Sequence, residues 1–151
     1  MLKKIFFTIL LLNLLNHCEY KPVYSNQNKV NYKIIVTSFN GDKEINNLIA
    51  STIKRNNNES SNKTLNISFD TNYTKNILAK NAAGTVTDYQ ANVITRFTIQ
   101  KENSSENFSI NEKFNFKKMT DEYEEKNYER TIKKNLANSI SQKLILKLSV
   151  N

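Results

Sequence analysis

The chain has 151 residues, a length typical of one domain, and a formal net charge of +8 at pH 7. Its only histidine, His17, and its only cysteine, Cys18, leave the rest of the chain without the ligands of common zinc sites, a Cys/His nucleophile or a Ser-His-Asp triad. Two glycines are too few for a glycine-rich phosphate-binding loop. The excess of positive charge favours partners that carry phosphate, although it can also serve solubility alone.

The N-terminal segment has the layout of a secretory signal. Lys3 and Lys4 precede an apolar run over residues 5–15, which is shorter than the roughly 20 residues that span a bilayer. Cys18 directly after this run indicates a bacterial lipoprotein, whose thiol is acylated and whose signal is cut just before it, because a lone thiol in an oxidising compartment otherwise lacks a partner. An ordinary signal peptide is the alternative, since His17 stands where lipoproteins have a small residue. The predicted organisation is a signal peptide over 1–17, a tether over 18–29 and one domain over 30–151.

The charge of the exported part also limits its partners. Removing Lys3 and Lys4 with the signal takes the 22 basic residues to 20, against 14 acidic ones, for a net charge near +6. A basic protein outside the cytoplasm is expected to meet phosphate on lipid head groups or on lipopolysaccharide. Nucleic acid is the least expected partner, because export separates the protein from it.

The domain is predicted to begin with a strand and a helix. Apolar and polar side chains alternate from Val30 to about Thr37, and this period of two is typical of a strand. Asn40-Gly41-Asp42 then gives a turn signal, and Asp42 can cap a helix that ends near Arg55. The apolar face of that helix recurs at helical spacing, with Ile45, Leu48, Ile49, Thr52 and Ile53.

Three further strands are predicted after a polar loop over 56–63. Each shows apolar residues at alternate positions, and their close spacing implies an antiparallel meander. The strands cover Leu65 to about Leu78, Ala91 to Ile99 and Phe108 to Phe116, separated by a turn over 81–85 and a polar hairpin loop over 102–107.

A long helix closes the chain and completes the fold prediction. Asp121 opens it, and the acidic residues that follow stabilise its dipole rather than form a catalytic pair. The helix is predicted from about Tyr123 to Leu148, with an apolar stripe at every fourth residue from Tyr128 to Leu148. The fold class is therefore α+β: a two-layer sandwich in which two amphipathic helices pack on one face of a four-stranded, largely antiparallel sheet, in the order β-α-β-β-β-α.

Three segments in this order resemble one family. Cys18-Glu19-Tyr20-Lys21-Pro22-Val23-Tyr24 is similar to the mature start of the alphaproteobacterial lipopolysaccharide-assembly lipoproteins of the LptE family, with Glu19 in place of a glycine. Ala83-Gly84-Thr85-Val86-Thr87-Asp88-Tyr89-Gln90-Ala91 resembles the start of the family's central strand. The stretch from Tyr128 through Leu136-Ala137-Asn138-Ser139-Ile140 to Leu148 resembles its C-terminal helix.

The resemblance implies a non-enzymatic role. Proteins of this family are lipid-anchored in the outer membrane, sit as a plug inside the LptD β-barrel, assist its folding and help to deliver lipopolysaccharide. The implied partners are thus an LptD-like outer-membrane β-barrel, lipopolysaccharide, and the membrane through a lipid on Cys18. No cofactor, metal or nucleic acid is expected.

Basic residues are the candidates for lipopolysaccharide contacts. The alternation places Arg96, Lys113 and Lys117 on the sheet face opposite the apolar core, with Lys33 beside them if the first strand shares the register. Lys101, at a hairpin, is a further candidate for phosphate or for the barrel wall. The alternative for each residue is an ordinary solvated sheet face.

Two other functions compete with this prediction. An independent periplasmic lipid- or ligand-binding lipoprotein would need a concave apolar pocket. An exported carboxylate-dependent hydrolase would need two acidic residues in one cleft, and nothing in the sequence pairs the strand-region candidates Asp70, Asp88 and Glu112.

Overall fold

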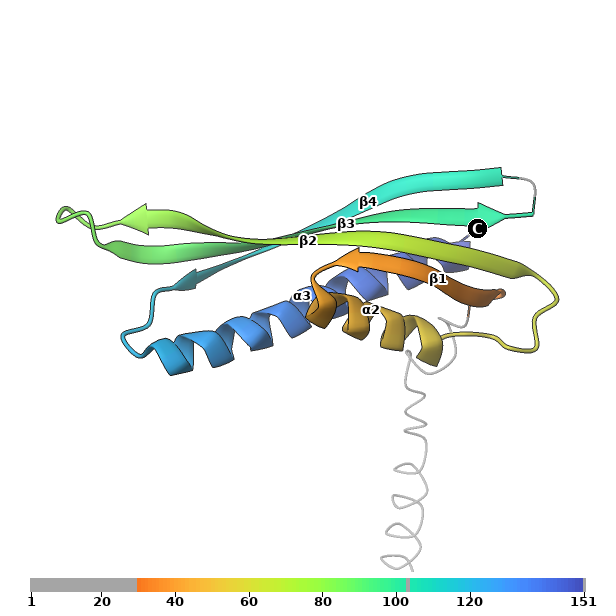
Figure 1. Ribbon diagram of the computed structural model, residues 1–151, viewed down its shortest axis with the longest axis horizontal. Coiled ribbons are helices and arrows are strands. Elements are labelled where there is room, and N and C mark those ends of the chain that lie inside the picture. Colours follow the sequence, from red (N-terminus) through yellow and green to blue (C-terminus); the bar gives the residue numbers. More distant parts are fainter. Residues whose placement is uncertain (1–29, 103, 151) are drawn as a thin grey trace, which may run out of the picture.

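The computed structural model describes residues 30–102 and 104–150. The predicted signal peptide (1–17), the predicted acylation site Cys18 and the predicted tether (18–29) lie outside the described residues. Both helices lie on one side of a single sheet, which gives two layers (Figure 1). This arrangement confirms the predicted α+β class and element order. The elements are β1 (Lys33–Gly41), α2 (Lys43–Arg55), β2 (Thr64–Lys80), β3 (Val86–Lys101), β4 (Ser104–Lys117) and α3 (Glu122–Val150).

The strands lie in the sheet in the same order as in the chain. β1 runs parallel to β2, whereas β2, β3 and β4 pair antiparallel and form the predicted meander. β1 and β2 are parallel because α2 lies between them in the chain: the helix carries the chain back to the end of the sheet at which β1 began, and β2 starts there. The sheet is therefore mixed but mostly antiparallel.

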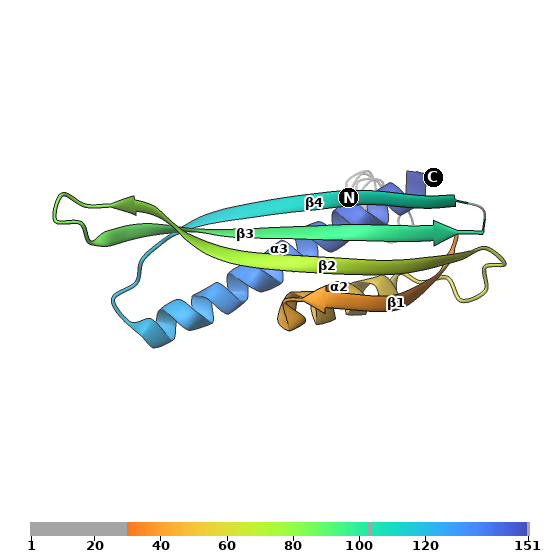
Figure 2. The same ribbon diagram turned by 45° about the horizontal axis from the view of Figure 1, so that its top comes forward.

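The hairpin between β2 and β3 is the longest feature of the molecule. These strands have 17 and 16 residues, and their connecting turn projects past the beginning of α3 (Figures 1 and 2). The turn matches its sequence signal: Gly84 has a φ of +78° and donates its N–H to the Asn81 carbonyl at 2.9 Å. The predicted polar loop over 102–107 is wrong, since β4 begins at Ser104 and Lys101 pairs with it. Backbone pairing rather than apolar burial makes that segment a strand, so its polar composition hid it.

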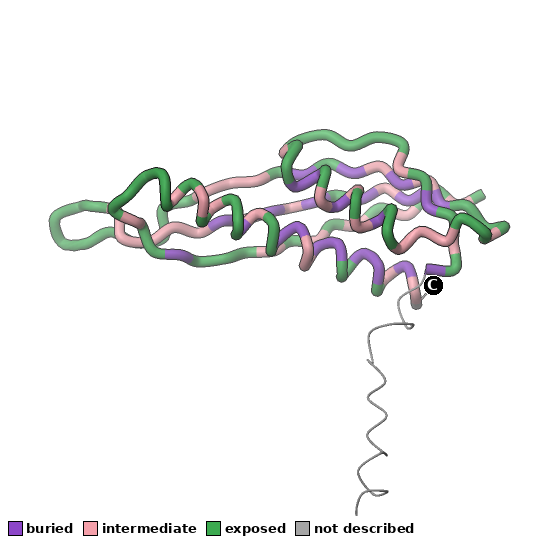
Figure 3. Tube along the Cα trace, turned by 90° about the horizontal axis from the view of Figure 1, so that it is seen from below, coloured by how far each residue is buried: buried purple, intermediate pink, exposed green. Residues whose placement is uncertain are grey.

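The core fills the space between the sheet and the helices (Figure 3). Burial of apolar surface there, at about 25 cal/mol per Å2, is the main stabilising contribution. Tyr128, where the predicted stripe of α3 begins, is 37% exposed, and continuous burial in that helix starts only at Ile132. The largest fully buried apolar side chains are Phe97, Ile45, Ile49, Ile53, Leu65, Ile67, Ile99, Ile132, Ile140, Leu144, Val30 and Val93.

The junction between β1 and α2 is closely fitted. Asp42 caps α2 as predicted, with its Oδ1 accepting the Ile45 N–H at 3.0 Å. Gly41 has a φ of +93°, and a Cβ on it would lie 1.9 Å from the Thr71 carbonyl oxygen of β2. The Asp42 N–H donates to that same oxygen at 3.0 Å, so the first strand and first helix meet β2 at one point.

Candidate functional site

Three of the basic residues singled out in the sequence lie on the outer face of the sheet. Arg96 stands between the buried Thr95 and Phe97, and Lys117 follows the buried Phe116. Lys113 pairs across the sheet with Asn92, which stands between the buried Ala91 and Val93. Whether these side chains contact lipopolysaccharide stays a prediction.

These three residues do not converge on one point. Arg96 pairs with Ser109, so the three positions follow one another along β4 at intervals of four residues, or about 13 Å. Arg96 also lies 3.6 Å from Asp70, with both side chains more than half exposed, and Lys117 has Asp88 as its cross-strand neighbour. The three basic residues therefore form a row along the sheet, with Asp70 and Asp88 next to them, and do not surround a single phosphate position.

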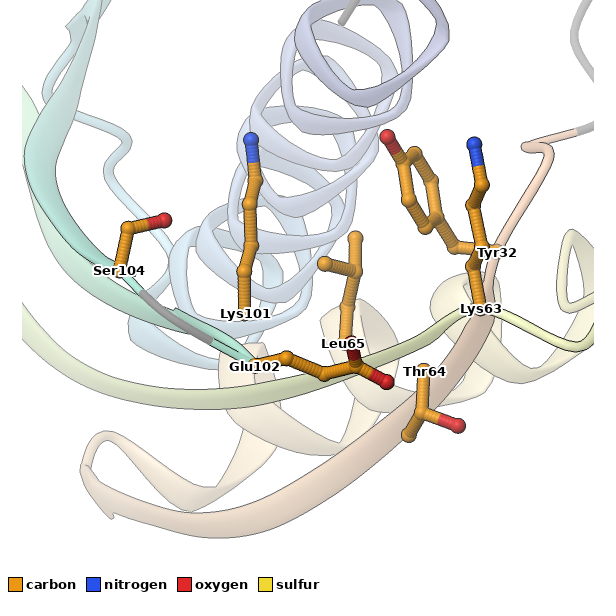
Figure 4. A pocket seen from close by; sticks show the side chains of 7 residues that line it. All are labelled: Tyr32, Lys63, Thr64, Leu65, Lys101, Glu102 and Ser104. Carbon is orange, nitrogen blue, oxygen red and sulfur yellow. The ribbon is translucent and has the colours of Figure 1, made fainter.

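Lys101 belongs to a different surface. It lies at the end of the sheet opposite the β2–β3 hairpin turn, on the face that the helices cover. It lines a cavity of about 290 Å3 together with Tyr32, Lys63 and Leu65. The ammonium groups of Lys101 and Lys63 and the hydroxyl of Tyr32 extend to the same side around Leu65, whereas the Glu102 carboxylate points away (Figure 4). We call this the basic cavity; its remaining lining residues are Thr64, Glu102 and Ser104.

The basic cavity combines two chemistries. Two ammonium groups attract an anion, and the carbon atoms of the Tyr32, Lys63 and Lys101 side chains, beside the buried Leu65, suit a short stretch of hydrocarbon. Its volume is at the low end for ligand sites, so it fits a head-group fragment rather than a whole lipid. Sequence reasoning missed Lys63, although it directly precedes β2. The antiparallel pairing of Asn66 with Gln100 is what brings the start of β2 to the end of β3.

The basic cavity also lies where the described chain begins. Tyr32 lines it, and Val30, two residues earlier, is fully buried in the core. The described chain therefore begins close to this cavity, at the end of the sheet opposite the β2–β3 hairpin (Figure 1).

A second charged cluster lies between the sheet and the first half of α3. The Lys75 ammonium lies 2.7 Å from Glu125 Oε1, 3.1 Å from Glu129 Oε2 and 4.2 Å from the centre of the Tyr89 ring. The Tyr73 hydroxyl donates to Glu129 at 2.7 Å. We call this the Lys75 cluster. Each charged group in this cluster has a partner within it, which indicates a structural role. The cluster attaches the first half of α3, which buries little apolar surface, to the sheet.

A neighbouring ion pair joins the two helices. The Lys133 ammonium lies 2.7 Å from Asp42 Oδ2, the capping carboxylate of α2, and 4.4 Å from the centre of the Tyr73 ring. Burial alone would raise the pKa of Asp42, but the hydrogen bonds from Lys133 and from the Ile45 N–H outweigh it and lower the pKa. The hydrogen bond from Lys75 lowers the pKa of Glu125 in the same way.

Acid is therefore expected to weaken the fold. The lowered carboxyl pKa values mean that the unfolded chain binds more protons, so the stability they provide is complete above about pH 4.5 and is lost as the pH falls through the folded pKa values. In urea denaturation series between about pH 6 and about pH 3, the urea concentration at the midpoint should decrease as the pH is lowered. A Lys133→Met variant should show a shallower fall, because Asp42 loses its partner. A midpoint that rises on acidification would contradict this assignment.

Comparison with solved structures shows where this fold occurs. No protein family's sequence profile matches the chain, and no curated protein matches it. Rare lipoprotein B from Shewanella oneidensis is 14% identical, with a TM-score of 0.56 over 74% of this chain and 94% of its own. Lipoprotein B from Nitrosomonas europaea is 14% identical, with a TM-score of 0.53 over 83% and 90%. A minor lipoprotein from Acinetobacter baumannii is 13% identical, with a TM-score of 0.52 over 77% and 94%.

The described domain thus has the fold found in bacterial lipoproteins of the rare lipoprotein B type. At this level of identity the similarity concerns the fold alone. Within residues 30–102 and 104–150, no helix is both long and apolar enough to cross a membrane.

Proposed function

We propose that the protein is a non-enzymatic outer-membrane lipoprotein that plugs an LptD-like β-barrel and assists lipopolysaccharide assembly. The observation that carries the proposal is the fold shared with rare lipoprotein B structures over most of both chains, together with the three sequence segments that resemble the LptE family.

The basic cavity is the contact we assign to lipopolysaccharide phosphate. Lys63 and Lys101 supply two cations, and the carbon atoms of their side chains and of Tyr32 line the cavity, which matches a phosphate next to hydrocarbon. A lipid on Cys18 would anchor the same end of the domain. The twelve residues of the predicted tether reach at most about 40 Å, so the cavity would stay near the membrane surface.

The alternative is an independent periplasmic lipoprotein that binds a lipid or another ligand. The basic cavity also favours this function, because it needs no barrel to complete it. The two functions differ in whether a barrel copurifies with the protein.

The first test is a pull-down of the tagged protein from native membranes in mild detergent. The proposal expects a near-stoichiometric outer-membrane barrel of LptD size among the bound proteins, identified by mass spectrometry. Recovery of the protein without the barrel, while the barrel is present in the input, would refute the plug role and leave the independent lipoprotein.

Lipopolysaccharide binding provides a separate prediction. Replacing both cavity lysines by glutamate, Lys63→Glu with Lys101→Glu, should weaken binding to immobilised lipopolysaccharide roughly tenfold or more, since each charge-assisted hydrogen bond contributes about 1.5 to 3 kcal/mol. The matched control replaces two exposed helical lysines, Lys54→Glu with Lys126→Glu. It changes the net charge by the same amount, so any loss of binding that it shows measures the effect of net charge alone. Equal losses in both variants would show that the cavity is not the contact.

The outer-face row is tested in the same assay. Reversal of Lys113 and Lys117 should leave lipopolysaccharide binding within a few-fold of the wild-type value, because their positions lie four residues, or about 13 Å, apart along β4 and do not converge on one phosphate. A loss larger than that of the cavity variant would move the contact to the outer face, where the sequence placed it.

A further inference from the structure

The sheet is open and has two edges, β1 and β4. An edge strand presents backbone N–H and C=O groups that can pair with a strand of another chain, and proteins usually block such pairing. The two edges are blocked to different extents, and the difference points to one short segment.

The β1 edge carries two protective features. Its register against β2 shifts between Val36 and Ser38, and such an irregularity bends an edge away from partners. The Ile34 N–H, which does not serve the ladder with β2, donates instead to the Asn57 side chain at 2.6 Å. Part of the β1 edge is thus already capped from within the chain.

The part of β4 up to Glu112 is protected by charges on its inner side. Glu106 and Glu112 stand opposite Ile99 and Val93, which are buried core residues of β3. Each carboxylate pairs with a lysine of α3: Glu106 with Lys147 at 2.8 Å, and Glu112 with Lys143. Inward-pointing charges of this kind oppose strand addition, because a strand added to this edge would bury them.

The last five residues of β4, Lys113–Lys117, have no inward-pointing charge and no register shift, and only the outer lysines oppose the addition of a strand. On the inner side Phe114 is 40% exposed, whereas Phe116 is buried, with its ring 6.1 Å from that of the 37% exposed Tyr128. Its outer-side residues include Lys113 and Lys117. A cavity of about 440 Å3 adjoins this segment and is lined by Asp88, Asn115, Phe116, Lys117, Met119 and Tyr128.

We propose that Lys113–Lys117 is a docking edge for an extended segment of a partner protein, which adds to the sheet as a further strand. The segment would alternate acidic residues, which face Lys113 and Lys117 and neutralise their protective charge, with apolar residues that cover the exposed rings of Phe114 and Tyr128. Backbone hydrogen bonds supply affinity in strand addition, and the alternating side chains supply specificity. This inference goes beyond the proposed function and does not require it.

A second copy of the chain fits this edge poorly. Antiparallel pairing of two β4 strands about Asn115 would match Phe114 with Phe116 but would set Lys113 directly opposite Lys117 of the second copy. Like charges in direct cross-strand pairs are destabilising, so charge favours an acidic partner strand.

The test uses the full chain in mild detergent and a blocked seven-residue peptide of alternating aspartate and valine. Amide signals of residues 113–117 should shift on titration, and their hydrogen exchange should slow by several-fold, while signals of β1 stay unchanged. The variant with Lys113→Glu and Lys117→Glu should lose this peptide and instead bind a lysine–valine peptide of the same length. The matched control, Lys33→Glu on the other edge strand, should keep the wild-type preference.

Three results would overturn the inference. One is the absence of any shift at residues 113–117 at millimolar peptide. Another is equal binding of both peptides by the wild type and by the doubly reversed variant, which would mean that charge does not select the strand. The third is a concentration-dependent dimer that protects residues 113–117, because a second copy would then occupy the edge. The lipopolysaccharide and pull-down assays are independent of all three, so this inference and the proposed function can fail separately.

Discussion

A Gly41→Ala variant is expected to lose about 2 to 5 kcal/mol of unfolding free energy, a large part of what a domain of this size has. Two effects add. An L-residue at a φ of +93° is strained by about 1 to 2 kcal/mol, and the new Cβ would lie 1.9 Å from the Thr71 carbonyl oxygen, forcing a backbone shift that costs about 1 to 3 kcal/mol. Urea denaturation followed by circular dichroism measures the loss. The Cβ position is fixed by the backbone of residue 41, and the atom that it meets belongs to the backbone of Thr71, so no side-chain rotation relieves the clash.

Gly84→Ala is the matched control for the backbone strain. Gly84 also has a positive φ, of +78°, but a Cβ there meets no atom within 4 Å. This variant should lose only about 1 to 2 kcal/mol. Similar losses at the two glycines would mean that the close approach of β1 to β2 contributes nothing, contrary to the geometry.

Lys75→Met is expected to be the most damaging change among the charged residues, at about 2 kcal/mol after a discount for partial exposure. The substitution keeps the length of the side chain but leaves Glu125 and Glu129 without their shared cation. It also removes the cation from the Tyr89 ring. Burial alone would lower the pKa of Lys75, whereas the hydrogen bonds to these glutamates raise it overall, so the folded state favours the charged form.

Hydrogen exchange locates the effect of this variant. Protection should fall mainly in the first two turns of α3, which precede the continuous burial that begins at Ile132. The control is Arg96→Met, which breaks a pair with Asp70 at 3.6 Å on the exposed outer face and should cost less than about 0.5 kcal/mol. Equal costs for the two variants, or a uniform loss of protection in Lys75→Met, would contradict a local clamp.

The fold could be predicted closely because its signals are local. Alternation gave the four strands, helical spacing gave the two helices, and Asn40-Gly41-Asp42 gave the junction between β1 and α2. The segment over 104–107 escaped because it is a strand by pairing alone. Its side chains carry no apolar alternation that a sequence pattern could detect.

The candidate site could be predicted only in part. Lys101 was a candidate from the sequence, but Lys63, which lines the basic cavity with it, is 38 positions away along the chain. The row of Arg96, Lys113 and Lys117 was placed on the correct face, yet its spacing of about 13 Å follows from the register of β3 and β4. Proximity across strands depends on register, which residue type does not reveal.

The sequence by itself determined the α+β class, the order of the elements, which face of each helix is buried and the α2 cap at Asp42, because each depends on residues within a few positions of one another. Only the tertiary structure decided which charges meet: Lys75 with Glu125 and Glu129, Lys133 with Asp42, and Lys63 with Lys101 around Leu65. It also decided which edge of the sheet stays open. The physical reason is that short-range periodicity fixes local structure, whereas electrostatic contacts and exposed edges arise from segments that packing brings together over long separations.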